Sequence, residues 1–122
     1  MAKTIVHYTP AQNPTVKASG ALSAGTFVMI ADAVDGRNPV VKTATAGAVA
    51  FGVPAHDVAD GGYVMVYRSG HIVEVAASGS VAAGDAVAVA ASGKAIKGDG
   101  TAPAVGIAVS ASANGTVQVA LN

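Results

Sequence analysis

Residues 77–90 read Ala-Ser-Gly-Ser-Val-Ala-Ala-Gly-Asp-Ala-Val-Ala-Val-Ala, a glycine-containing turn followed by an apolar run that suits a β-strand. Residues 18–31 follow the same plan, and aligning the two segments without gaps pairs identical residues at seven positions. The identical pairs are Ala18/Ala77, Ser19/Ser78, Gly20/Gly79, Ala24/Ala83, Gly25/Gly84, Val28/Val87 and Ala31/Ala90. The chain therefore contains an internal repeat, and this repeat decides how the rest of the sequence is interpreted.

The segments that follow each copy correspond as well. Residues 51–55 resemble residues 105–109. Asp60-Gly61 precedes an alternating run in the first copy, as Asn114-Gly115 does in the second. The repeat therefore includes several strands and the turns between them.

Two copies are too few for a solenoid, which needs about three or more stacked repeats. We therefore predict a single β domain, residues 18–122, containing pseudo-repeats 18–67 and 77–121. The predicted fold class is all-β, with the two β-units combined in a small barrel or sandwich. An extended N-terminal arm, residues 1–17, precedes the domain.

The composition indicates a thin core and an oligomer. Hydrophobic residues make up 52% of the 122 residues, but alanine and valine supply most of them and aromatic residues only 4%. Small side chains bury little apolar area, so association is expected to supply part of the stability. Charged residues are 11% of the chain, which suggests that another protein covers some of the surface.

The charges also exclude some partners. Seven basic and seven acidic residues cancel and neither sign clusters, which argues against nucleic acid and against an anionic membrane surface. The absence of cysteine excludes disulfides and thiolate chemistry. We expect no signal peptide and no transmembrane span, because no apolar run is long enough for either.

Short apolar runs between turn residues indicate strands throughout the domain. The predicted strands are residues 26–30, 40–43, 48–54, 63–67, 71–75, 85–90, 94–97, 104–109 and 116–121. We expect residues 32–39 to form a loop, Gly52 to lie at a bulge, and Asn114-Gly115 to form a tight turn. No stretch shows helical periodicity with caps at its ends.

The N-terminal arm differs from the domain in its residue pattern. Residues 5–8 suit a short strand, and Pro10 and Pro14 interrupt the following segment because proline lacks the amide proton that a strand ladder needs. In one alternative the arm packs on its own domain as an edge strand. In the other it reaches a neighbouring subunit, since a terminal segment is ordered only where something holds it.

No group of residues points to catalysis or to a bound cofactor. His7, His56 and His71 are far apart in the sequence, and the closest polar group, His56 with Asp57 and Asp60, is interpreted as a loop between strands rather than a metal site. The serines lie mostly beside glycine or alanine in turns, and none is in a nucleophile elbow. We therefore predict no catalytic residue, no cofactor and no metal.

The large side chains of the domain are assigned to the core or to an oligomer interface. Their number is too small for a sugar-stacking platform, which usually includes tryptophan. In the run 63–67, alternation places the two tyrosines and the methionine on one face of the strand. The residues assigned in this way are Phe27, Phe51, Tyr63, Met65 and Tyr67.

Three motifs resemble the small capsid decoration, or head cement, proteins of tailed bacteriophages. They are Ala-Gly-Asp-Ala-Val at residues 83–87, Val-Gly-Ile-Ala at 105–108 and Gly-Thr-Val-Gln-Val-Ala-Leu at 115–121. The resemblance covers residues 18–121 and consists of strands and turns without a catalytic signature.

The resemblance implies a structural virion protein without enzymatic activity. Such a protein is made in the host cytoplasm, binds the major capsid protein on the outer surface of an icosahedral head, and bridges capsomers as an oligomer, typically a trimer. It also implies that the arm helps to grip the shell by adding a strand to a sheet edge of the shell protein. The arm residues that this role concerns are Thr4, Ile5, Val6, His7, Tyr8, Pro10 and Pro14.

Two other classes of function remain open from the sequence. One is a non-catalytic binding module of a phage tail or cell surface that recognises glycan or protein, which clustered exposed aromatic residues would favour. The other is an enzyme-associated β-domain, for which a cleft containing His56, Asp57 and Asp60 would be the first place to look.

Overall fold

The computed structural model describes Lys3 and residues 14–122, and the fold of this part is all-β, as predicted. The strands are β1 (Thr15–Ala18), β2 (Val28–Asp35), β3 (Asn38–Thr43), β4 (Val53–Pro54), β5 (Tyr63–Tyr67), β6 (Ile72–Ala76), β7 (Ala86–Val89), β8 (Ala95–Lys97), β9 (Gly106–Ala108) and β10 (Thr116–Leu121). One 3-10 turn, η1 (Ala91–Gly93), connects β7 to β8.

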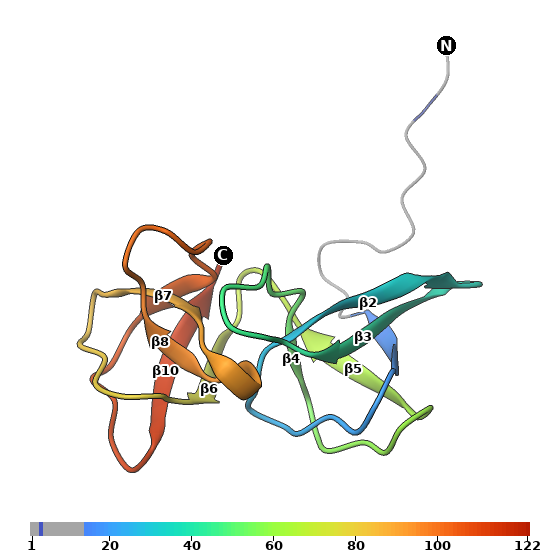
Figure 1. The fold of residues 1–122 in the computed structure, drawn as a ribbon, viewed down its shortest axis with the longest axis horizontal. Coiled ribbons are helices and arrows are strands. Elements are labelled where there is room, and N and C mark those ends of the chain that lie inside the picture. Colours follow the sequence, from blue (N-terminus) through green and yellow to red (C-terminus); the bar gives the residue numbers. More distant parts are fainter. Residues whose placement is uncertain (1–2, 4–13) are drawn as a thin grey trace.

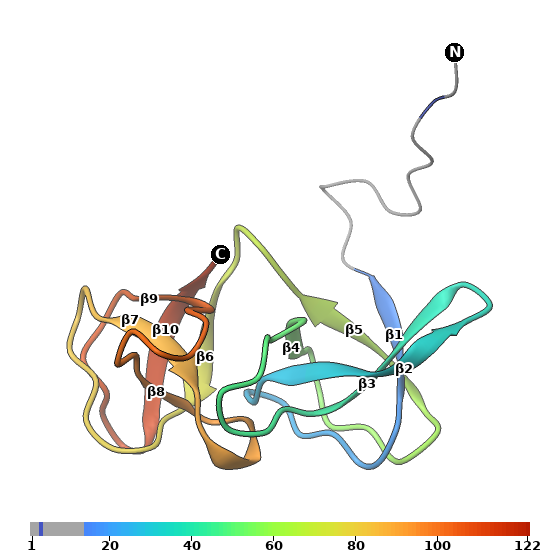
Figure 2. The same ribbon diagram turned by 45° about the horizontal axis from the view of Figure 1, so that its top comes forward.

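The strands form two five-stranded sheets that lie side by side (Figure 1). The first sheet has the order β2-β3-β1-β5-β4, and the second has the order β6-β10-β9-β7-β8. We call residues 15–67 the first unit and residues 72–121 the second unit. Figure 2 shows the same two groups of strands from a second direction.

The two units have the same strand pairing. Val16 opposes Val64 between β1 and β5, and Val75 opposes Val117 at the corresponding place between β6 and β10. The remaining equivalent pairs are Val53↔Tyr67 with Ile107↔Ala120, Val28↔Thr43 with Val87↔Lys97, and Val28↔Gly52 with Val87↔Gly106. Strands β1 to β5 therefore correspond one by one to β6 to β10, with the offsets of the sequence repeat.

Each sheet curls until its end strands meet. In the first sheet the end strands β2 and β4 are linked by the bridge Val28↔Gly52, and in the second unit the bridge Ala77↔Ala95 links the end of β6 to β8. Each link is one bridge pair rather than a continuous ladder. The arrangement of the described residues is thus sandwich-like, and neither sheet is a closed barrel.

The core is made of small side chains, and valine dominates it. One cluster lies inside the first sheet and includes Val16, Leu22 and Val66. The other lies inside the second sheet and includes Val75, Val87 and several further valines. Among the described residues, no polar or charged residue is buried.

Phe27 joins the two units. It comes from the first unit but is fully buried in the core cluster of the second, together with Val53 and Ala44. Backbone hydrogen bonds also cross the junction: Gly47 N–H donates to Val89 O at 2.9 Å, and Ala76 N–H to Gly25 O at 2.8 Å.

Two local predictions are confirmed. In β5, Val64 and Val66 are buried while Tyr63, Met65 and Tyr67 lie on the other face, as the alternation requires. Asn114 and Gly115 both have positive φ, at 54° and 77°, and the flanking Ala113 and Thr116 exchange two backbone hydrogen bonds. This is the geometry of a two-residue hairpin turn.

Other local predictions were wrong. The expected loop 32–39 is mostly strand, because β2 and β3 extend to Asp35 and from Asn38 around a short turn. Ile30, placed in a buried strand, is 48% exposed. Of the expected strand 48–54 only β4 forms, and the register shifts lie in β2 rather than at Gly52.

Candidate functional site

The predicted capsid-binding arm lies almost entirely outside the described residues. This applies to Thr4, Ile5, Val6, His7, Tyr8 and Pro10. Pro14 is described: it is buried, and its carbonyl accepts a hydrogen bond of 3.0 Å from Val66 N–H in β5. The point from which an arm would extend is therefore fixed to the first sheet.

The residues assigned to the core or an oligomer interface occupy different environments. Phe27 is completely buried at the junction of the units. Tyr63, Met65 and Tyr67 lie on the outer face of the first sheet, where Tyr63 is 55% exposed. The ring of Tyr67 lies 5.1 Å from that of His71, in the connection between the two units.

Phe51 is held by an arginine that the sequence analysis did not single out. The guanidinium carbon of Arg68 lies 4.2 Å from the centroid of the Phe51 ring, and Arg68 Nε donates a hydrogen bond of 2.7 Å to the Phe51 carbonyl. A cation over an aromatic face is attracted by the negative face of the ring. These two contacts join Phe51 of the first unit to Arg68 in the connection between the units.

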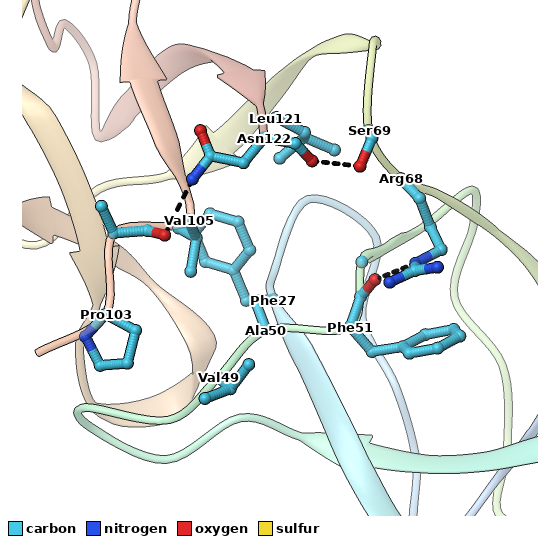
Figure 3. Close-up of a pocket in the computed structure, with 12 residues that line it drawn as sticks. Phe27, Val49, Ala50, Phe51, Arg68, Ser69, Pro103, Val105, Leu121 and Asn122 are labelled. Carbon is cyan, nitrogen blue, oxygen red and sulfur yellow. Dashed lines mark hydrogen bonds between the residues drawn. The ribbon is translucent and has the colours of Figure 1, made fainter.

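This pair stands at the rim of a groove between the units (Figure 3). The groove has a volume of about 220 Å³. The first unit contributes Phe27, Val49 and Phe51, and the second contributes Pro103, Val105 and Leu121. Next to Arg68, the Ser69 hydroxyl donates to the Asn122 carbonyl, and Asn122 Nδ2 donates to the Ala104 carbonyl at 2.9 Å. Most side chains that line the groove are apolar, which suits contact with another apolar surface.

His56, Asp57 and Asp60 lie in an exposed loop, where both carboxylates bind backbone. Asp57 Oδ1 accepts the amide N–H of Ala24 at 2.8 Å, and Asp60 Oδ1 accepts that of Gly20 at 2.8 Å. His56 Nδ1 lies 2.9 Å from the Asp57 carbonyl. Asp57 and Asp60 therefore hold the repeated turn 19–25 in place.

Two other charged groups have shifted pKa values. Lys17 Nζ donates a hydrogen bond of 2.9 Å to Asp35, and this bond and the adjacent negative charge raise the pKa of Lys17. The hydroxyl and the amide of Thr101 both donate to Asp99 Oδ1, which lowers the pKa of Asp99. Both groups are on the surface.

No group of three or more His, Cys, Asp or Glu side chains suitable for a metal ion occurs among the described residues. In the same part of the chain there is also no helix long and apolar enough to cross a membrane.

The outer face of the second sheet carries a second apolar surface. Ile72, Ala120, Ile107 and Ala86 oppose one another in turn across β6, β10, β9 and β7. Ile107 is 52% exposed and Ile72 is 62% exposed. Sequence analysis missed this row, although the alternation of β10 places Ala120 on the face opposite to the buried Val117 and Val119.

Comparisons with known proteins agree with this picture. The model of the phage cement protein family matches residues 6–122 of the chain. No curated protein matches it. Among solved structures, the head fiber gp8.5 N base of bacteriophage phi29 is similar, with a TM-score of 0.73 and 21% sequence identity over 88% of this chain and 91% of that one. At this identity the likeness shows a shared fold.

Proposed function

The chain belongs to the phage cement protein family, and from this premise we propose that it binds the outer surface of an icosahedral phage head as a homotrimer and bridges neighbouring capsomers. As a member of that family it is a structural protein of the phage head. The observation that carries the proposal is the family match, which includes nearly the whole chain.

Exposed apolar side chains support the oligomer. A contiguous apolar patch on the surface of a small protein often marks a contact with another protein. The described residues of this kind are Ile30, Val34, Val49, Tyr63, Ile72, Ile96, Ile107 and Val109, each at least 39% exposed. A chain with few charges and many such side chains gains stability when its copies associate.

The arm is proposed to make the contact with the major capsid protein. Extended residues can add a strand to the edge of another sheet through main-chain hydrogen bonds, which demand little of side-chain identity. We assign this role to Thr4, Ile5, Val6, His7 and Tyr8, continuing through Pro10. Pro14, bonded to Val66, would then transmit load from the shell to the first sheet.

Stabilisation of the head follows from multiplicity. Each trimer would hold several capsomers at once, and binding of the second and third arms is favoured because the first keeps them at high local concentration. Closed symmetry repeats the same contact at every equivalent position of the shell. We propose no catalytic activity for the protein and place it on the outside of the virion.

The test is binding to expanded phage heads that lack the protein. A variant without residues 1–13 keeps Pro14 and its bond to Val66, so we expect it to fold and to keep its oligomeric mass but no longer to sediment with heads. His56→Ala, in an exposed loop, serves as the control and should bind like the natural chain. If the natural chain shows no saturable binding to heads, the proposed function is wrong. If the chain without residues 1–13 binds heads as well as the natural chain does, the arm does not make the contact with the shell.

A further inference from the structure

The apolar row on the outer face of the second sheet has an equivalent in the first sheet, and the two rows differ in what covers them. The strand pairing gives three residues of the row on the second sheet an equivalent in the first unit. The equivalent positions are Phe27 for Ala86, Val53 for Ile107 and Tyr67 for Ala120. Phe27 and Val53 are 0% and 2% exposed, whereas Ile107 is 52% exposed. One row is buried and the other is open.

The second unit covers the row of the first sheet. Phe27 and Val53 belong to the cluster that contains Val75, Val87 and Val119 of the second unit. Phe27 N–H donates a hydrogen bond of 2.7 Å to the carbonyl of Gly93, in the connection between β7 and β8. The outer row of the first unit thus docks on the second unit, close to the turn that follows β7, the second strand of that unit.

We propose that the Ile107 face, formed by Ile72, Ala86, Ile107 and Ala120, binds a second copy of the chain in the same head-to-tail way. The first unit of that copy would then cover the Ile107 face as the second unit covers Phe27 and Val53. This inference rests on the proposed function, because it supplies the subunit contact of the proposed trimer. Since the two contacting surfaces differ, the contact is heterologous and can close into a ring.

The register also identifies the part of the copy that meets the Ile107 face. The connection between β7 and β8, which receives Phe27, corresponds to the β2–β3 hairpin of the first unit. That hairpin carries Val34, which is 59% exposed, and β2 carries Ile30, which is 48% exposed. The hairpin also carries Asp32, Asp35 and Arg37, so Ile30 and Val34 supply the apolar part of the contact with the Ile107 face.

The Ile107 face is continuous with the contact between the units. Ile72 lines a pocket at the junction together with Val53 and Tyr67 of the first unit. The row itself contains no charged residue. Ala86 stands at the position equivalent to Phe27. The proposed contact between two chains therefore lacks the aromatic side chain that is buried between the two units of one chain.

Cysteine cross-linking tests the contact, since the chain has no cysteine of its own. Ile107→Cys and Val34→Cys are prepared separately and treated with a short bismaleimide. If the contact is head-to-tail, neither variant should cross-link alone. Covalent dimers should form when the two variants are mixed and allowed to exchange subunits. His56→Cys, at an exposed loop position, replaces Val34→Cys as the control and should give no dimers with Ile107→Cys.

Light scattering separates this inference from the proposed function. Ile107→Asp should reduce the mass of the oligomer to the 11.7 kDa of one chain, and His56→Asp should leave the mass of the oligomer unchanged. If the natural chain is trimeric but Ile107→Asp is trimeric too, or if Ile107→Cys cross-links with itself, the contact surface is wrong while the trimer stands. If the natural chain is a monomer both free and on heads, the trimer itself is wrong.

Discussion

The amide of Phe27 donates a hydrogen bond to the carbonyl of Gly93. The carbonyl oxygen of Phe27 lies only 2.6 Å from the position that a Cβ on Gly93 would take. The two residues come from different units, so the backbones of the units approach as closely here as a glycine allows. The buried phenyl ring is held in place by this approach.

Gly93→Ala is expected to destabilise the chain more than a substitution at another turn glycine. Gly93 has φ of +72°, and the new methyl group would overlap the Phe27 carbonyl. Strained backbone of this kind costs about 1–3 kcal/mol, and the overlap adds to it. Gly79→Ala is the matched control, because Gly79 has φ of +80° but nothing within 4 Å of its Cβ position. Urea unfolding should show the larger loss for Gly93→Ala; equal losses would contradict the close approach.

Phe27→Ala should remove about 3–5 kcal/mol from the free energy of unfolding, the usual cost of deleting a buried aromatic side chain. The ring is fully buried and lies between the two units, so its loss leaves a cavity where they meet. Tyr63→Ala, at a site that is 55% exposed, should cost much less. Denaturant titration of the two variants measures the difference. A small loss for Phe27→Ala would mean that the units hold together without the ring.

Arg68→Met is expected to lower stability by about 1–2 kcal/mol, the sum of an exposed cation–π contact and one hydrogen bond. The variant keeps an apolar side chain over Phe51 but has neither the charge nor the Nε–H that bonds the Phe51 carbonyl. Arg68→Lys keeps the charge alone and should lie between the natural chain and Arg68→Met. If Arg68→Lys equals the natural chain in thermal unfolding, the Nε hydrogen bond contributes nothing.

Asp57→Ala and Asp60→Ala should each reduce stability by about 1 kcal/mol, because each removes a hydrogen bond to a backbone amide. His56→Ala, in the same exposed loop, should leave stability unchanged. None of the three variants should change binding to phage heads. A loss of head binding without a loss of stability would show that the loop contacts the shell.

The Lys17–Asp35 pair should make stability depend on pH in alkaline solution. The pKa of Lys17 is raised in the folded chain, so the pair's contribution is fully present below the ordinary lysine pKa of about 10.4 and is lost as the pH rises through the folded value. In Asp35→Asn the pKa of Lys17 should fall toward its ordinary value. NMR titration of the Lys17 side chain measures both values, and an unchanged pKa in Asp35→Asn would contradict the assigned cause.

Local patterns in the sequence predicted the local structure well. The run 63–67 alternates and becomes β5 with the expected buried face, and Asn114-Gly115 forms the turn before β10. Both depend on near neighbours, since side-chain alternation and positive φ are properties of a few residues. The predicted pseudo-repeats, 18–67 and 77–121, leave out Thr15–Lys17 of β1 and all of β6, so the sequence did not indicate that these two strands are equivalent.

Contacts between the units were not predictable in this way. Phe27 belongs to the first repeat, but its surroundings come from the second, and no local pattern reports them. The expected loop 32–39 looked irregular because it contains aspartate, glycine and proline, yet pairing between β2 and β3 continues through most of it. The row around Ile107 is formed by four different strands, so it becomes apparent only from the strand pairs of the second sheet.

The curled sheets also have a consequence for solubility. An unpaired strand edge offers free N–H and C=O groups to other molecules and is a common starting point of aggregation. In the described part of the chain the bridges Val28↔Gly52 and Ala77↔Ala95 turn the sheet ends toward each other. The ends of each sheet therefore offer fewer free backbone groups for edge-to-edge pairing with other copies of a chain that is 52% hydrophobic.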